Sequence, residues 1–206
     1  MALLLIIYLL AETGITSCVL YEDNSHYADR QHVSDFTAVA ELMFVMKQSR
    51  STAVLPRPVC QAMMKLNQVS SGEFRYVVYF ATESARTNLR AFVTTLSIGI
   101  TAAENGNRHH PNTLTFRTSQ ISLYIGGPFI SFKLLYADPH NGCFILVTFG
   151  GLGGRVCRLL QSSRTVRFVI PRECIRIYTQ NCPGETRNMY HPGCGTRLPH
   201  IVEWGR

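Results

Sequence analysis

Hydrophobic and polar positions alternate with a period of two over much of the chain beyond residue 58, as in strands with one buried face. Runs rich in Val, Ile, Thr, Phe and Tyr span residues 59–66, 74–82, 90–101, 113–119, 121–125, 129–137, 143–149 and 156–161. Turn residues at 70–72, 104–106, 126–128 and 138–142 divide them. Seven or eight short strands without intervening helices predict an all-β fold, either an antiparallel sandwich or an up-and-down barrel.

The segment before these strands has a different period. Apolar residues from Phe36 to Phe44 recur at helical spacing after a polar lead-in at 21–32, which predicts a short helix within 33–46. Residues 42–46 fit a first strand equally well. In the run 74–80, Phe74, Tyr76 and Phe80 share one face. An eight-stranded barrel either fills itself with such side chains or holds one small ligand, so the pattern leaves both open.

The N-terminus carries a short apolar run at residues 3–10, against the roughly 20 residues that a membrane-spanning helix needs. Small residues follow at 14–18. We therefore expect residues 1–17 to be a signal peptide and residues 18–206 to form one secreted, extracellular domain, a monomer without a membrane partner. An N-terminal anchor is the alternative.

Seven cysteines support export to an oxidising compartment. Cys18 lies at the expected cleavage point, and the other six allow 15 disulfide pairings, among which the sequence does not choose. The spacings contain no C-x-x-C pair, so we expect no metal site. The adjacent His109 and His110 lie in a turn without further ligands nearby.

The distribution of charged residues limits the classes of binding partner that we expect. Residues 155–206 contain nine arginines and three acidic residues, whereas residues 1–154 are nearly balanced. Such a patch suits anionic small molecules, anionic glycans, an acidic protein, or simply a solvated face. No nucleic-acid motif accompanies it, so we expect no nucleic-acid partner. No catalytic triad, carboxylate pair or phosphate-binding loop is present, which predicts neither an enzyme nor a cofactor.

A resemblance emerges from the order of these features. Tyr136-Ala-Asp138 precedes an Asn-Gly-Cys143 turn, Cys157-Arg-Leu159 follows, and the spacing Pro171-x-x-Cys174-x-x-x-Tyr178-x-x-x-Cys182 ends with Cys194. This arrangement, over residues 27–194, resembles the tick salivary lipocalins related to the histamine-binding proteins. The resemblance implies an eight-stranded antiparallel lipocalin-type barrel with a short N-terminal helix and a C-terminal helix. It also implies the disulfides Cys60–Cys194, Cys143–Cys174 and Cys157–Cys182, and sequestration of small host mediators that suppresses inflammatory defence.

Two motifs depart from the amine-binding members of that family, which carry Cys-Asp on one strand and Glu-Leu-Trp or Glu-Leu-Tyr on the next. Here Phe144 follows Cys143, and Arg158-Leu-Leu160 follows Cys157. A buried amine needs a carboxylate partner, so these changes disfavour histamine. If Arg158 faces the interior, the site favours an anion such as a fatty acid or leukotriene. If it faces solvent, it has no such role.

Two hypotheses follow. The first is a carrier of an amine or lipid mediator. Its candidate ligand-binding residues are Phe44, Tyr76, Val78, Phe80, Phe132, Tyr136, Phe144, Arg158 and Leu160. The second is a barrel filled by its own side chains, whose basic C-terminal face inhibits a host complement or clotting protein.

Overall fold

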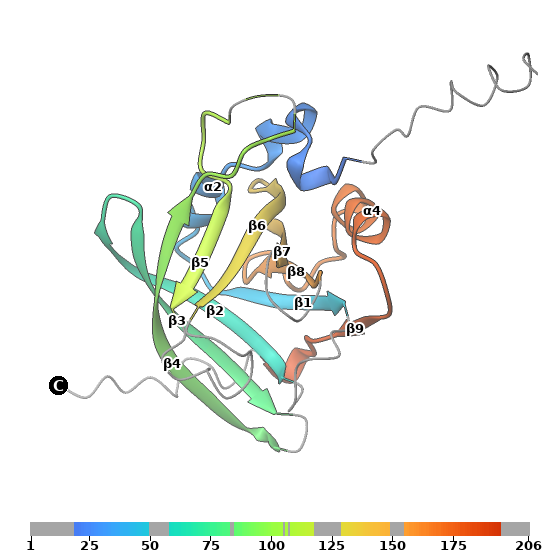
Figure 1. Ribbon diagram of the computed structural model, residues 1–206. Coiled ribbons are helices and arrows are strands. Elements are labelled where there is room, and N and C mark those ends of the chain that lie inside the picture. Colours follow the sequence, from blue (N-terminus) through green and yellow to red (C-terminus); the bar gives the residue numbers. More distant parts are fainter. Residues whose placement is uncertain are drawn as a thin grey trace, which may run out of the picture.

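The computed structural model describes residues 19–49, 58–82, 85–104, 106, 108–117, 129–148 and 155–194. Eight antiparallel strands form the barrel, and they are β1 (Met43–Ser49), β2 (Pro58–Ser70), β3 (Glu73–Thr82), β4 (Ala85–Gly99), β5 (Thr113–Arg117), β6 (Phe129–Asp138), β7 (Cys143–Thr148) and β8 (Cys157–Ser162). Neighbours in sequence pair in turn, and β1 pairs with both β8 and β2. Since the first strand thus meets the second and the last, the sheet is closed. The predicted barrel is confirmed (Figure 1).

The first strand resolves the ambiguity that the sequence left at residues 33–46. Helix α2 covers only Val33–Ala38, and β1 begins at Met43, so both interpretations hold for different parts of the segment. The short strand β9 (Thr186–Asn188) pairs with the end of β1. The predicted strand at residues 121–125 lies outside the described residues.

Helix α2 closes one end of the barrel (Figure 1). The backbone N–H of Val33 donates to the carbonyl of Pro111 at 2.9 Å, which fixes the helix at this end. The Phe36 ring lies with its centroid 6.2 Å from that of Tyr76 and 5.6 Å from that of Phe144. Because Phe36 is fully buried among residues of the barrel interior, α2 acts as a plug.

Helix α4 (Arg172–Asn181) packs on the outside of the barrel against β6 and β7 (Figure 1). Its buried residues Cys174, Ile177 and Tyr178 recur at helical spacing and face the wall. Disulfides fasten both ends of the helix, since Cys174 bonds to Cys143 on β7 and Cys182 bonds to Cys157 on β8. The third disulfide joins Cys60 to Cys194, so the pairing is the one that the family resemblance implies.

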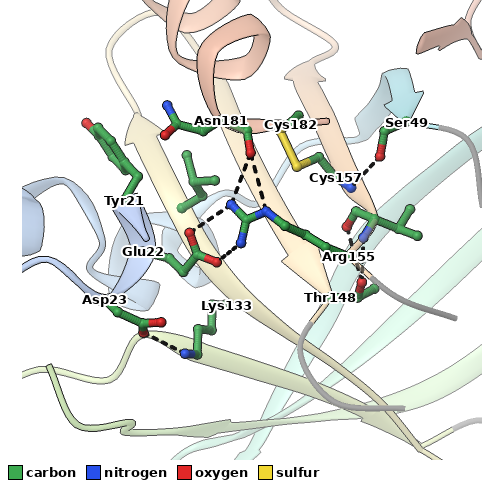
Figure 2. Close-up of polar contacts among 12 residues, drawn as sticks. Tyr21, Glu22, Asp23, Ser49, Lys133, Thr148, Arg155, Cys157, Asn181 and Cys182 are labelled. Carbon is green, nitrogen blue, oxygen red and sulfur yellow. Dashed lines mark hydrogen bonds and ion pairs between the residues drawn. A yellow bond between two sulfur atoms is a disulfide. The ribbon is translucent and has the colours of Figure 1, made fainter. Parts of the chain in front are cut away.

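The N-terminal segment is held against the barrel by ion pairs. It forms two 3-10 turns, η1 (Tyr21–Asp23) and η2 (Ser25–Arg30). Figure 2 shows the Arg155 guanidinium between the carboxylate of Glu22 and the main chain of Asn181 at the end of α4. Glu22 is only 3% exposed, and Arg155 Nη2 donates to its Oε2 at 2.9 Å. One arginine therefore joins the N-terminal segment, the start of β8 and α4.

Within the described part of the chain, no helix has both the length and the apolar composition that crossing a membrane requires.

Candidate ligand-binding site in the barrel interior

The barrel interior is lined by one continuous apolar cluster. Its buried members are Val33, Phe36, Met43, Val45, Met63, Phe74, Tyr76, Val78, Leu96, Leu114, Phe116, Phe132, Leu134, Ala137, Phe144, Leu146, Leu160 and Met189. Strand alternation accounts for this set, because every second residue of a barrel strand points inward. One buried charged residue, Arg158, adjoins this cluster through its contact with Phe132.

Arg158 supplies a positive charge inside the barrel. It lies between Cys157, which bonds outward to Cys182, and Leu159, which packs beneath α4, so alternation directs the arginine inward. Its guanidinium carbon lies 5.1 Å from the centroid of the Phe132 ring, and its Nε donates to the side-chain oxygen of Gln48 at 2.9 Å. The sequence left the direction of Arg158 open, and the structure places it inside.

Burial dominates the electrostatics of Arg158. The residue is 9% exposed, and desolvation lowers its pKa from the ordinary value of an arginine to about 10. An opposite charge within a few ångströms would act in the other direction, and none among the described residues contributes. The described contacts of the guanidinium are a neutral amide and an aromatic ring. The cation therefore lies in a low-dielectric interior without an anion among these contacts.

The strand register places Arg158 away from the plug. Met43, which follows α2, pairs with Ser162, whereas Gln48 at the far end of β1 pairs with Arg158. The step of four positions from Arg158 to Ser162 corresponds to about 13 Å along a strand. The cation therefore lies toward the end of the barrel that α2 does not cover.

Tyr76 provides a second polar group, near the end of the barrel that α2 closes. Its ring contacts Phe36 of the plug and the Phe116 ring, whose centroid lies 6.2 Å away. The side chain is fully buried, its hydroxyl has no hydrogen-bond partner among the described residues, and burial raises its pKa. Phe116 in turn lies 6.1 Å from Phe132, so aromatic rings connect the orphan hydroxyl to Arg158 across the interior.

Most candidate ligand-binding residues lie inside. Tyr76, Val78, Phe132, Phe144 and Leu160 belong to the interior cluster, with Arg158 beside them. Phe80 is partly exposed and contacts Phe92, which packs against the same cluster.

Two candidates lie outside the interior, so their proposed role is corrected. Phe44 packs with Tyr190 on the outer side of β1, since its neighbours in sequence, Met43 and Val45, are the inward residues. Tyr136 packs beneath α4 because the pairing of β6 with β7 contains an irregularity between Leu134 and Tyr136, which reverses the alternation. A strict period of two counted from Phe132 directs Tyr136 inward and therefore fails.

The candidate ligand-binding residues predicted from the sequence do not include Gln48, Phe116 and Phe36. Gln48 is a buried polar residue in an apolar strand, and that contrast is a usable signal. Phe116 falls within a predicted strand, but the sequence does not indicate its partners. Phe36 belonged to the predicted helix, and only the tertiary structure directs that helix into the barrel end.

Other groups are less suited to bind a ligand. Cys60, His191 and Cys194 are the one cluster among the described residues with metal-ligand geometry, but both cysteines are joined in a disulfide. A depression of about 420 Å³ lies outside the barrel, and it is lined by Val19, Leu20, Asp23, Ala102, Ala103, Glu104 and Lys133. An ion pair of 2.6 Å between Lys133 and Asp23 occupies part of its wall.

Comparison with known proteins identifies the family. The family model described as tick histamine binding protein matches residues 21–196, most of the chain. This chain belongs to the tick histamine-binding protein family. The search of curated proteins gave no significant match. Family membership agrees with the barrel and its external helix, and it makes the chain a ligand-binding, lipocalin-like protein.

Solved structures support the fold. Japanin from Rhipicephalus appendiculatus, bound to cholesterol, has a TM-score of 0.53 at 13% identity, covering 74% of this chain and 95% of that chain. A serotonin complex of AM182 has a TM-score of 0.52 at 10% identity, covering 84% and 90%. Apocrustacyanin C2 has a TM-score of 0.54 at 10% identity, covering 88% and 92%. At such low identity these likenesses establish the lipocalin fold alone.

Proposed function

We propose that this family member is a secreted carrier of an amphipathic organic anion, a fatty-acid-like or eicosanoid mediator that it sequesters from a host. The carboxylate of the ligand pairs with Arg158, and its hydrocarbon tail lies among the apolar side chains toward the plug. The observation that carries the proposal is a buried guanidinium whose described contacts are neutral.

The same observation disfavours a cationic amine. A protonated amine in the interior would meet the like charge of Arg158 at low effective dielectric, where repulsion is strong. The position after Cys143 holds Phe144, whose side chain is fully buried in the interior cluster and offers no countercharge. A carboxylate instead gains a charge-assisted, potentially bidentate hydrogen bond with the guanidinium.

Tyr76 supports a second feature of the ligand. Its hydroxyl is buried near the plug without a partner in the described part of the chain, and such a group gains free energy when a ligand oxygen reaches it. An anion with an additional hydroxyl or carbonyl group toward the tail satisfies both ends of the site. A plain saturated fatty acid satisfies Arg158 only.

Native mass spectrometry of the disulfide-intact protein tests the proposal. The probes are a long-chain fatty acid, the fatty alcohol of equal length, histamine and serotonin. We expect the acid to bind and the alcohol and amines to bind far more weakly. Arg158→Gln should weaken acid binding by about a hundredfold or more, while Arg75→Gln, on an exposed position of β3, leaves it unchanged.

Two results would overturn the proposal. Equal binding of acid and alcohol by the unmodified protein removes any role for the guanidinium. Retention of an amine, with no loss in Arg158→Gln, shows that another group recognises the ligand. If no probe binds, the filled-barrel interpretation is favoured, in which the basic C-terminal face contacts a host protein.

A further inference from the structure

The loop between β8 and α4, residues 163–170, presents two large apolar side chains to solvent. Phe168 is 70% exposed and Val169 is 91% exposed, the highest values among the large hydrophobic residues that the structure describes. An exposed pair of this kind at a loop tip is a candidate contact with another apolar phase, because water solvates it poorly.

The tip is held by hydrogen bonds. The backbone N–H of Ser163 donates to the carbonyl of Leu42 at 2.7 Å, and that of Phe168 donates to the carbonyl of Thr165 at 2.8 Å. The side-chain amide of Gln161 donates to the same Thr165 carbonyl at 2.8 Å. These bonds anchor the turn to the barrel end, so its apolar residues are presented in a fixed position.

Arginines surround the tip. Arg164, Arg167 and Arg172 are all exposed. Arg164 lies 3.8 Å from the carboxylate of Glu41, a distance typical of a weak surface pair. No ion pair is recorded for Arg167 or Arg172 within the described ranges. Apolar side chains flanked by cations are complementary to a surface that has an apolar interior and an anionic boundary.

We propose that this loop docks the protein on an anionic lipid bilayer, with Phe168 and Val169 inserted at the interface and the arginines on lipid phosphates. A protein partner fits less well, because a stable protein interface covers roughly 800 Å² on each side, far more than two side chains supply. The sequence predicted no membrane partner, since it lacks a spanning helix, and it does not reveal that these two residues are exposed.

The position of the loop makes docking independent of ligand binding. Ser163 bonds to Leu42, in the connection between α2 and β1, so the tip lies at the plugged end of the barrel. Arg158 lies toward the opposite end. A protein docked through the tip therefore keeps the end of its barrel opposite α2 away from the bilayer.

Vesicle flotation of the full, disulfide-intact chain tests the proposal. We expect binding to vesicles of phosphatidylcholine with phosphatidylserine, little binding to phosphatidylcholine alone, and weakening at about 0.5 M salt. Phe168→Ser with Val169→Ser should reduce binding at least about tenfold. The matched control is Val93→Ser, which changes a 42% exposed residue on β4 and should have no effect.

Charge is tested separately. Arg167→Gln with Arg172→Gln should weaken binding by about fivefold for each arginine removed, whereas Arg75→Gln with Arg90→Gln removes equal charge elsewhere and should weaken it less. Circular dichroism and fatty-acid binding should be unchanged in every variant, which separates this proposal from the preceding one.

Three results would overturn it. These are no binding to either vesicle, equal loss in the tip and control variants, and tight capture of an acidic protein without any affinity for vesicles.

Discussion

Replacement of Arg158 by methionine should stabilise the ligand-free protein. The guanidinium is buried and its described contacts are neutral, so the folded chain holds a desolvated charge that the unfolded chain exposes to water. Methionine has a similar length and places an apolar chain in an apolar interior. Under the proposed function, a bound anion offsets this cost, and the substitution removes the cost from the ligand-free protein.

The magnitude follows from the pKa. Lowering the pKa of Arg158 from its ordinary value to about 10 corresponds to a cost of roughly 3 kcal/mol. Because the folded chain has the lower pKa, it binds fewer protons between these values, and stability rises with pH only above about 10. The cost is fully present at neutral pH. The substitution also removes the Gln48 hydrogen bond and the Phe132 contact, and each loss destabilises the folded chain by about 1 kcal/mol. The net increase in the free energy of unfolding is therefore about 1 kcal/mol.

Urea denaturation of the disulfide-intact protein at neutral pH, without ligand, measures this gain. A gain of 1 kcal/mol raises the midpoint of thermal unfolding by about 3 °C for a chain of this size. Arg75→Met, at an exposed position, should change the free energy of unfolding by less than about 0.5 kcal/mol. A loss above about 2 kcal/mol in Arg158→Met would refute the reasoning, because the guanidinium would then have a stabilising partner in the free protein.

Other predictions concern the ion pair between Arg155 and Glu22, the buried hydroxyl of Tyr76 and the turn at Gly142. Arg155→Ala should lower the free energy of unfolding by about 3–5 kcal/mol, because it leaves buried Glu22 unpaired, while Arg176→Ala at an exposed pair should have a far smaller effect. Tyr76→Phe should be neutral or stabilising by about 1 kcal/mol in denaturation and should weaken only hydroxylated ligands. Gly142→Ala should destabilise by more than about 1 kcal/mol in urea, because its φ of 65° is left-handed and the new Cβ would lie 2.3 Å from a serine hydroxyl. Unchanged stability in Arg155→Ala or Gly142→Ala would contradict these contacts.

Alternation identified the strands because each has one face toward an apolar interior and one toward a different environment. It failed at Tyr136, where an irregular pairing shifts the register and two consecutive side chains, Leu135 and Tyr136, face outward. It also gave no basis for choosing the face of Phe44. A local pattern states that two faces differ, but which face is inside depends on how the sheet closes.

The sequence by itself determined the β-rich class, the spacing of the cysteines after residue 143, and the presence of Phe144 and Arg158 directly after Cys143 and Cys157. These are properties of residue type and spacing along the chain. Only the tertiary structure decided that α2 plugs the barrel, that Arg158 points inward beside Gln48, and that Phe168 is left in solvent. Such features depend on contacts between residues that are far apart in sequence. Loop closure, strand register and burial set those contacts together, and no single segment encodes them.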